Sequence, residues 1–440
     1  MNVETEELLD FIAECPTPFH TVQASATRLR LAGFAELSLT EPWELRRGGK
    51  YFVTVYDSTL LAFVVGETEG PLRITAAHTD FPCFRIKPQA SIVKEKCGLL
   101  NVEKYGGLIL RSWLDRPLSL AGKVVLRGED AFNPEIRLVD FERPLVTIPS
   151  LAIHMDREVN DEGKLNAQTD MLPLAAAFAA AGKTADGGEE EAGEDSEKEF
   201  FTKWLAAELE ASAQDILSYE LSAYPVEHGC ALGLRAELVS SPRLDNLTSV
   251  QACLDGICAA DAAGRGLSLT ALFDNEEVGS NTKQGAGSAV LMQVLERSYA
   301  ALELPKEQLF TDIAAGFMLS VDVAHAVHPN HVDKADPVVH PVLGGGLVIK
   351  QAASQSYAGD AEAVAIVRGL CEDEDIAWQQ FVNRSDSRGG STLGSIASAL
   401  VPMRTMDVGV PILSMHSARE TMAGADQQAL VRLLQRFYRG

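Results

Sequence analysis

The chain has 440 residues, of which 46% are hydrophobic, so it is long enough to bury a large core and to form two domains. Its formal net charge of −24 argues against nucleic acids and anionic membranes as partners. Seven scattered cysteines without a CxxC pair argue against a disulfide framework and a thiolate zinc site. The acidic N-terminal segment does not resemble a signal peptide, and no apolar run approaches the roughly 20 residues that span a bilayer. We therefore expect a cytoplasmic protein.

The first half of the chain is rich in short predicted strands. Residues 51–56, 60–66 and 72–77 combine β-branched and aromatic residues, which are typical of strands. Further β-like runs, such as 122–128 and 144–150, follow between glycines and prolines. This half is therefore expected to contain mainly β structure.

An acidic segment separates these strands from a predicted helix. Residues 182–200 hold eight acidic and two basic residues and almost no apolar ones, which predicts a solvated loop or a flexible insertion. The apolar residues of the next stretch, 200–221, recur at helical spacing. We therefore expect one helix over 200–221.

From about residue 240 onward, predicted strands and helices alternate. Apolar strands are expected at 267–273, 316–323 and 405–410, and the last helix at about 418–438. Such alternation predicts an α/β fold with a doubly wound, mostly parallel sheet that is covered by helices. The β-rich middle, about 91–238, then interrupts this fold as an inserted domain.

Ligand-type side chains recur where predicted strands end. Because ligands of open α/β sheets bind beyond the carboxyl ends of the strands, these side chains are expected to converge at one edge. Histidines and carboxylates suit divalent ions such as zinc, manganese or cobalt. The candidates are His78 and Asp80 after 72–77, Asp245 at a helix start, Glu276 and Glu277 after 267–273, Asp322 at the end of 316–323, and His416 after 411–415.

Each candidate also has an ordinary structural alternative. Asp245 could cap a helix, the histidines could be hydrogen-bonded core residues, and Asp322 could form a buried salt bridge. The acidic pair Glu276–Glu277 could be a solvated loop. What favours a site is that several strand ends carry side chains of the same ligand type.

The adjacent glutamates have a specific chemical use. Neighbouring side chains in an extended segment point in opposite directions, so one carboxylate could bind a metal while the other acts as a general base. A metal lowers the pKa of its bound water towards 7 and polarises a carbonyl group, and the second carboxylate accepts the proton. This combination is what amide hydrolysis requires.

Other catalytic motifs give little support. The chain has no complete phosphate-binding loop, no HExxH motif and no GxSxG motif. His325, His328 and His331 form a rival metal set, but Pro329 breaks their helical spacing. A loop contact or a place in a substrate pocket remains the alternative for these histidines.

Eight motifs in order resemble the M18 metallopeptidases, the family of aspartyl aminopeptidase and aminopeptidase I, and favour its bacterial branch. They cover essentially the whole chain, and their number and order make the resemblance specific. The motifs are HTDFP, YGGLILRSWLDRPL, LAIHMDR, SSPRLDNL, DNEEVGS, VDVAHAVHPN, GGSTLG and MHSARE.

The resemblance implies an aminopeptidase with two metal ions, most simply zinc, and a metal-bound water as nucleophile. His78 and Asp322 would bind one ion, Glu277 and His416 the other, and Asp245 would bridge them. Glu276 would be the general base, and Asp80 would orient His78. The resemblance further implies that His154 reaches the active site of a neighbouring subunit.

The resemblance also implies the domain roles and the assembly. Residues 1–90 and 239–440 would form the catalytic domain, and 91–238 a dimerisation domain that contains the acidic segment. Peptides would be the substrates, and the chain would form a homo-oligomer, a dodecamer built from dimers. The stretch GGGLVIK, which ends at Lys350, departs from the family pattern, so a preference for acidic N-terminal residues does not follow.

Two competing hypotheses remain at this point. A related di-metal amidohydrolase, such as a carboxypeptidase or a deacylase, would use the same ligands. A non-catalytic peptide-binding assembly would be expected to lack a ligand or Glu276, yet every matched position is intact.

Overall fold

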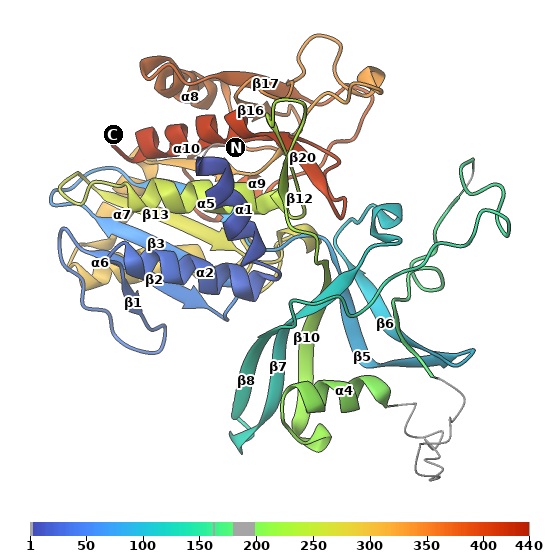
Figure 1. Ribbon diagram of the computed structural model, residues 1–440. Helices are drawn as coiled ribbons and strands as arrows, with labels where there is room; N and C mark the ends of the chain where they lie inside the picture. Colours follow the sequence, from blue (N-terminus) through green and yellow to red (C-terminus); the bar gives the residue numbers. More distant parts are fainter. Residues whose placement is uncertain (1–2, 162, 179–198, 440) are drawn as a thin grey trace. The chain divides into compact units, whose positions relative to one another are not determined.

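A computed structural model describes residues 3–161, 163–178 and 199–439 (Figure 1). These residues divide into two compact units, one that ends at Phe81 and resumes at Gly229, and one that spans Pro82–His228. Most of the predicted acidic insertion, residues 182–198, lies outside the described residues. Among the described helices, none is both long and apolar enough to cross a membrane.

The first unit is built around a large mixed sheet. Within the described ranges it has nine strands, and β13, β4, β14 and β18 lie side by side and parallel. The β2–β3, β3–β13 and β16–β18 pairings are antiparallel, whereas both edge pairs are parallel. In spatial order the strands are β1 (Ala35–Leu37), β2 (Lys50–Val55), β3 (Thr59–Val65), β13 (Leu267–Phe273), β4 (Arg73–His78), β14 (Phe317–Val321), β18 (Arg404–Gly409), β16 (Leu347–Gln351) and β17 (Trp378–Val382).

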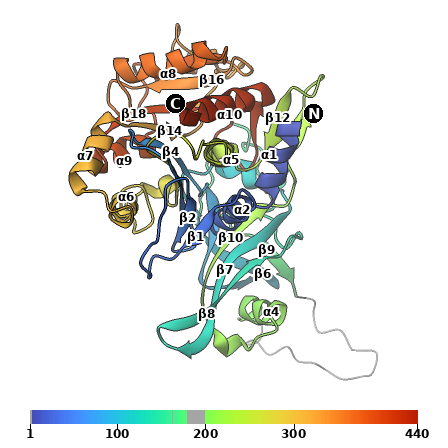
Figure 2. The ribbon, with the colours of Figure 1, turned by 90° about the vertical axis from the view of Figure 1, so that its left-hand side faces the viewer.

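Helices pack on both faces of this sheet, as Figures 1 and 2 show. Strand β3 is buried on both faces of the sheet. Leu60, Ala62 and Val64 belong to one buried cluster, and the residues between them belong to another. A strand that is buried on both faces needs a continuous apolar run, as in LLAFVV. The first cluster contains residues of α1 (Val3–Ala13), α2 (Pro18–Leu31), α5 (Leu244–Cys258), α8 (Ala361–Asp373) and α10 (Gly424–Arg439), and the second of α6 (Val290–Ala301), α7 (Lys306–Ala315) and α9 (Leu393–Leu400).

A smaller sheet of five described strands completes the first unit. Its order is β11 (Cys230–Leu232), β12 (Leu238–Ser241), β20 (Glu420–Ala423), β19 (Pro411–Leu413) and β15 (Ala324–His325). The helix predicted over 418–438 is therefore wrong at its start, because α10 begins only at Gly424. Residues 420–423 instead pair with β12 on one side and β19 on the other. These backbone hydrogen bonds join segments that are distant in sequence, and they override the local helical pattern.

The second unit is an antiparallel sheet with one described helix. The helix predicted over 200–221 is only partly correct: α4 (Phe200–Glu208) ends before Glu210, which has a positive φ of 50°. Pairing of β10 with β7 and β5 then makes Ile216–Pro225 a strand. The spatial order is β8 (Asn133–Asp140), β7 (Leu118–Asp130), β10, β5 (Cys83–Lys94), β6 (Cys97–Tyr105) and β9 (Leu174–Ala177).

Four short 3₁₀ turns occur among the described residues, and one of them carries two candidate site residues. They are η1 (Leu110–Trp113), η2 (Ala213–Asp215), η3 (Glu276–Val278) and η4 (Val332–Lys334). With these elements, the chain has a mixed α/β architecture with several sheets. The expected α/β class is confirmed at this level.

A buried tyrosine ties the C-terminal helix to the centre of the large sheet. The Tyr438 hydroxyl lies 2.7 Å from the main-chain oxygen of Leu269, 2.7 Å from Thr75 Oγ1 and 2.9 Å from Thr270 Oγ1. These partners belong to the adjacent strands β4 and β13. The hydroxyl therefore connects α10 to the two strands that lead towards the candidate site.

We predict that Tyr438→Phe lowers the free energy of unfolding by about 1–3 kcal/mol, because buried polar partners lose a hydrogen bond. Urea unfolding followed by circular dichroism measures the change. Tyr56→Phe is the matched control, since Tyr56 is 54% exposed. Equal midpoints for wild type and Tyr438→Phe would contradict the prediction.

Candidate active site

Three neighbouring parallel strands end together and present most of the candidate residues. Phe273, the last residue of β13, is in register with His78, the last residue of β4. Strand β14, on the other side of β4, ends one residue before Asp322. The strand-end argument from the sequence thus holds for His78, Asp322 and the segment after Phe273.

The segment DNEE forms a tight turn. Asn275 has a left-handed φ of 63°, and Glu276 and Glu277 begin the 3₁₀ turn η3. The extended conformation assumed for the two glutamates is therefore wrong. Asp274 accepts the backbone N–H of Asn275 through Oδ1 (2.7 Å) and so belongs to the turn.

Asp80 holds this turn against strand β4. Its Oδ1 accepts the backbone N–H of Glu276 and its Oδ2 that of Glu277, both at 3.1 Å. Its main-chain oxygen lies 2.9 Å from Nδ1 of His78, closer than its Oδ1 at 3.4 Å. When Nδ1 carries the proton and donates it to this carbonyl, Nε2 has its lone pair available as a ligand.

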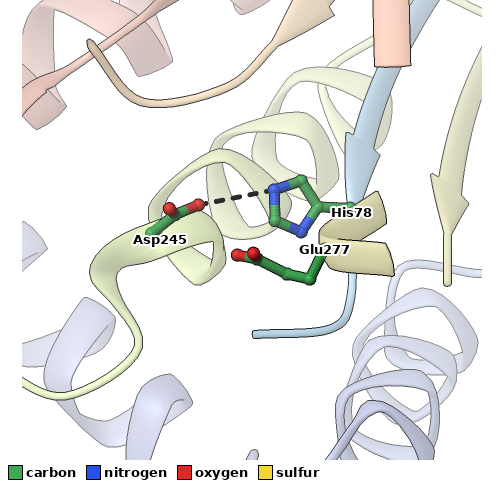
Figure 3. Close-up of side chains that lie close together, drawn as sticks. All are labelled: His78, Asp245 and Glu277. Carbon is green, nitrogen blue, oxygen red and sulfur yellow. Dashed lines mark ion pairs between the residues drawn. The ribbon is translucent and has the colours of Figure 1, made fainter. Parts of the chain in front are cut away.

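Asp245 lies between two imidazoles. Its Oδ1 is 3.4 Å from Nε2 of His78, and its Oδ2 is 3.3 Å from Nε2 of His416 (Figure 3 shows the first pair). Asp245 itself departs from helical geometry, with φ −82° and ψ 102°, although it lies at the start of α5. The Asp245 carboxylate faces the two imidazoles, which favours a role in the site over the alternative of a helix cap.

The remaining candidates lie on either side of Asp245. Asp322 Oδ1 is 3.7 Å from Nε2 of His78, and Glu277 Oε1 is 3.5 Å from Nε2 of His416. Glu276 lines the same cavity. All six residues from the large sheet edge, the start of α5 and the β19–β20 loop thus come together.

The spacing of these atoms fits shared metal ligation better than direct hydrogen bonding. Two ligand atoms about 2.1 Å from one ion at a tetrahedral angle lie roughly 3.4 Å apart. Ligand atoms of His78, Asp245 and Glu277 all lie within 4.8 Å of one another. Asp245 Oδ1 and Glu277 Oε1 are buried and have no hydrogen-bond partner among the described residues. The donor set, the spacing and these two oxygens fit divalent ions.

The electrostatics agree with this interpretation. Burial raises the pKa of Glu276 to about 8, and the charges of Asp322 and Asp80 act in the same direction. Burial also raises the pKa of Glu277 well above its usual range, and Asp245 adds to the effect. Burial alone would lower the pKa of His78, but three nearby carboxylates, Asp245 first, raise it well above the usual value. Such a concentration of carboxylates needs compensating positive charge.

Glu420 is a part of the site that the sequence did not assign. Its Oε2 accepts the backbone N–H of Asp245 (3.0 Å), and its Oε1 accepts that of His416 (2.8 Å). It lies in the motif MHSARE, but the helix expected over 418–438 would have placed it on a different element. Its signal would have been a carboxylate four residues after a candidate ligand.

The cluster opens into a cavity of about 380 Å³. Lys350, on its wall, donates to the main-chain oxygens of Asp322 (3.1 Å) and Val323 (2.9 Å), so its ammonium hydrogens are already engaged by the protein. His325 is among the residues that line the cavity, and His328 and His331 are not. The rings of His328 and His331 lie 4.9 Å from each other. Of the three rival histidines, only His325 is thus at the cavity wall.

His154 belongs to the other unit. It is exposed on the segment between β8 and β9, next to the exposed side chains of Ile153 and Met155. Its role at a neighbouring subunit stays a prediction.

Comparisons with known proteins show relatives along nearly the whole chain. The family described as aminopeptidase I zinc metalloprotease (M18) matches residues 11–438. A protein of Clostridium novyi named "Probable M18 family aminopeptidase 2" is 42% identical over 436 residues, which cover 98% of each chain.

Solved structures are similar along nearly the whole chain. A chain in the cryo-EM structure of the Ape4 and Nbr1 complex is 34% identical, with a TM-score of 0.89 over 99% of this chain and 85% of that one. The mApe1 dodecamer of S. cerevisiae is 25% identical, with a TM-score of 0.83 over 99% and 96%. The family match and the close bacterial relative establish that the chain belongs to the M18 family of zinc metallopeptidases and is a metallo-aminopeptidase.

Proposed function

We propose that the cluster holds two divalent metal ions and that the enzyme uses them to hydrolyse the bond after the N-terminal residue of a peptide. The observation that carries this proposal is the position of Asp245, whose two carboxylate oxygens each face a different imidazole. One carboxylate between two histidines is the arrangement that a bridging ligand requires. The family membership supplies the reaction class, metal-dependent aminopeptidase chemistry.

The ligands divide into two sets around Asp245. His78 and Asp322 hold one ion, and Glu277 and His416 hold the other. The pairs support this division, since Asp322 is near His78 (3.7 Å) and Glu277 is near His416 (3.5 Å). Zinc is the ion we expect in both positions, in line with the family description.

Glu276 is the general base in this proposal. When bound, the ions supply Lewis acidity, which acidifies a water molecule and polarises the carbonyl group of the scissile bond. A Glu276 Oε atom accepts the proton of the attacking water and returns it to the leaving amine. Asp80 keeps the base and its neighbouring ligand in place through their backbone N–H groups.

The two units have separate roles in the proposal. The unit that contains the cluster is the catalytic domain, with a doubly wound sheet, and the unit Pro82–His228 is a dimerisation domain. The S. cerevisiae relative is a dodecamer, and we extend a homo-oligomer of this kind to the present chain, with His154 completing a neighbouring active site. A cytoplasmic location remains a prediction from the sequence.

Chelation should abolish activity, and zinc, manganese or cobalt should restore it. A panel of aminoacyl chromogenic substrates with acidic, basic and neutral residues measures the release and shows which residue is preferred. The same substrates with acetylated N-termini are the control, because an aminopeptidase needs the free amine and should not release the chromophore from them. If no substrate is cleaved in a metal-dependent manner, the proposed function is wrong.

The variants Glu276→Gln and Glu277→Gln should distinguish the residue that acts as general base from the residue that binds a metal ion. Glu276→Gln should reduce kcat by about 10²–10⁴-fold, since the base contributes on this scale, while both ions stay bound. Glu277→Gln should release one ion more readily, because a neutral amide is a poorer ligand than a carboxylate. Metal content after dialysis and kcat on the same samples are the measurements. A near-normal rate for Glu276→Gln would refute its assignment as the base.

A further inference from the structure

A single buried carboxylate joins two candidate ligands that lie far apart in sequence. Glu420 is the first residue of β20, the middle strand of the small sheet, and it is only 2% exposed. Its Oε1 accepts the N–H of His416 at 2.8 Å, and its Oε2 accepts the N–H of Asp245 at 3.0 Å. Each oxygen thus holds the backbone of one ligand residue.

The two segments that Glu420 holds have unusual backbone conformations. His416 has a φ of 66°, and Ser414 before it has a φ of 59°, a region that residues with a Cβ atom adopt infrequently. Asp245 is non-helical at the start of α5, after Arg243 with a φ of 60°. Such conformations persist when surrounding contacts fix them. Glu420 provides one contact to each segment.

We propose that Glu420 is a positioning residue that sets the distance between Asp245 and His416 and thereby the affinity for one of the two metal ions. This inference rests on the proposed dinuclear site. Glu420 would hold the two ligands in place by accepting their backbone N–H groups. Asp80 has the same relation to Glu276 and Glu277, and its two oxygens also accept two N–H groups.

The chemistry of the two N–H groups requires a carboxylate of this length. Two donors that converge on one side chain need two acceptor oxygens, whereas a glutamine amide offers one oxygen and places an NH₂ group against the other donor. Aspartate keeps both oxygens but is one methylene shorter. A second buried carboxylate beside Asp245 is unfavourable for stability, because the two negative charges repel each other. Bound cations would offset that repulsion.

Asp426 offers a matched control on a neighbouring element. It lies in the first turn of α10, is fully buried, and accepts the N–H groups of Gly344 and Gly346, both at 2.8 Å. It therefore has the same chemistry as Glu420, but neither glycine belongs to the metal cluster. If breaking two buried hydrogen bonds only lowers stability, substitutions at Glu420 and at Asp426 should have the same effect on metal binding.

The test compares zinc binding and stability of full-length wild type, Glu420→Gln and Asp426→Asn. Zinc affinity is measured by competition with a chromophoric chelator and bound zinc by elemental analysis. Glu420→Gln should lower the affinity for one of the two ions by about 10- to 100-fold, the usual effect of losing a partner that orients a ligand. Asp426→Asn should keep both affinities, although both variants lower the unfolding midpoint.

Glu420→Asp is a second variant, to be used if Glu420→Gln does not fold. It should also lower the affinity for one of the two zinc ions. Unchanged affinity for both ions in whichever Glu420 variant folds would overturn the positioning role. A wild type that binds two zinc ions and cleaves peptides in the same series shows that the proposed function stands independently of this result. A wild type that binds no zinc would instead refute the proposed function itself.

Discussion

The constraint on which this structure depends is the repulsion among carboxylates that are gathered in one buried place. Asp80, Asp245, Glu276, Glu277 and Asp322 lie around His78, and Glu420 adds a further acidic group behind Asp245. Burial raises the pKa of Glu420 to about 8, in the same direction as at Glu276. Proteins tolerate such a cluster when backbone donors and cations balance it.

Two different sheets meet this constraint in the same way. At the edge of the large sheet, the Asp80 carboxylate accepts two N–H groups from the turn that carries the glutamates. At the small sheet, Glu420 accepts two N–H groups from the segments that carry Asp245 and His416. The small sheet also includes β15, which begins two residues after Asp322. Its strands therefore border three of the five candidate metal ligands.

The sequence predicted those parts of the site that depend on one strand and its end. Strand 267–273 was predicted with the bounds of β13, and His78, Asp322 and Glu277 followed from the rule that ligands lie beyond strand ends. Glu420 could not be found in this way, because residues 418–438 have a helical pattern and β20 exists only through its pairing with β12 and β19. Strand β10 was missed for the same reason. What local sequence failed to predict was pairing between distant segments.

Interactions between charged side chains extend from the candidate metal ligands to the wall of the cavity. Lys350 is 2% exposed and lies 3.5 Å from Asp322 Oδ2, and its ammonium also contacts two main-chain oxygens and lies 4.9 Å from the centre of the Tyr357 ring. Burial raises the pKa of Asp407 to about 6, and the charge of Lys350 opposes that rise. Asp407 in turn accepts the hydroxyl of Thr392 (2.9 Å) and the N–H of Ala358, next to Tyr357 on the cavity wall. Because the charges of Asp322 and Asp407 both act on Lys350, one candidate ligand is linked electrostatically to residues around the cavity. The charge of Lys350 is therefore already balanced within the protein by the Asp322 carboxylate and two main-chain oxygens.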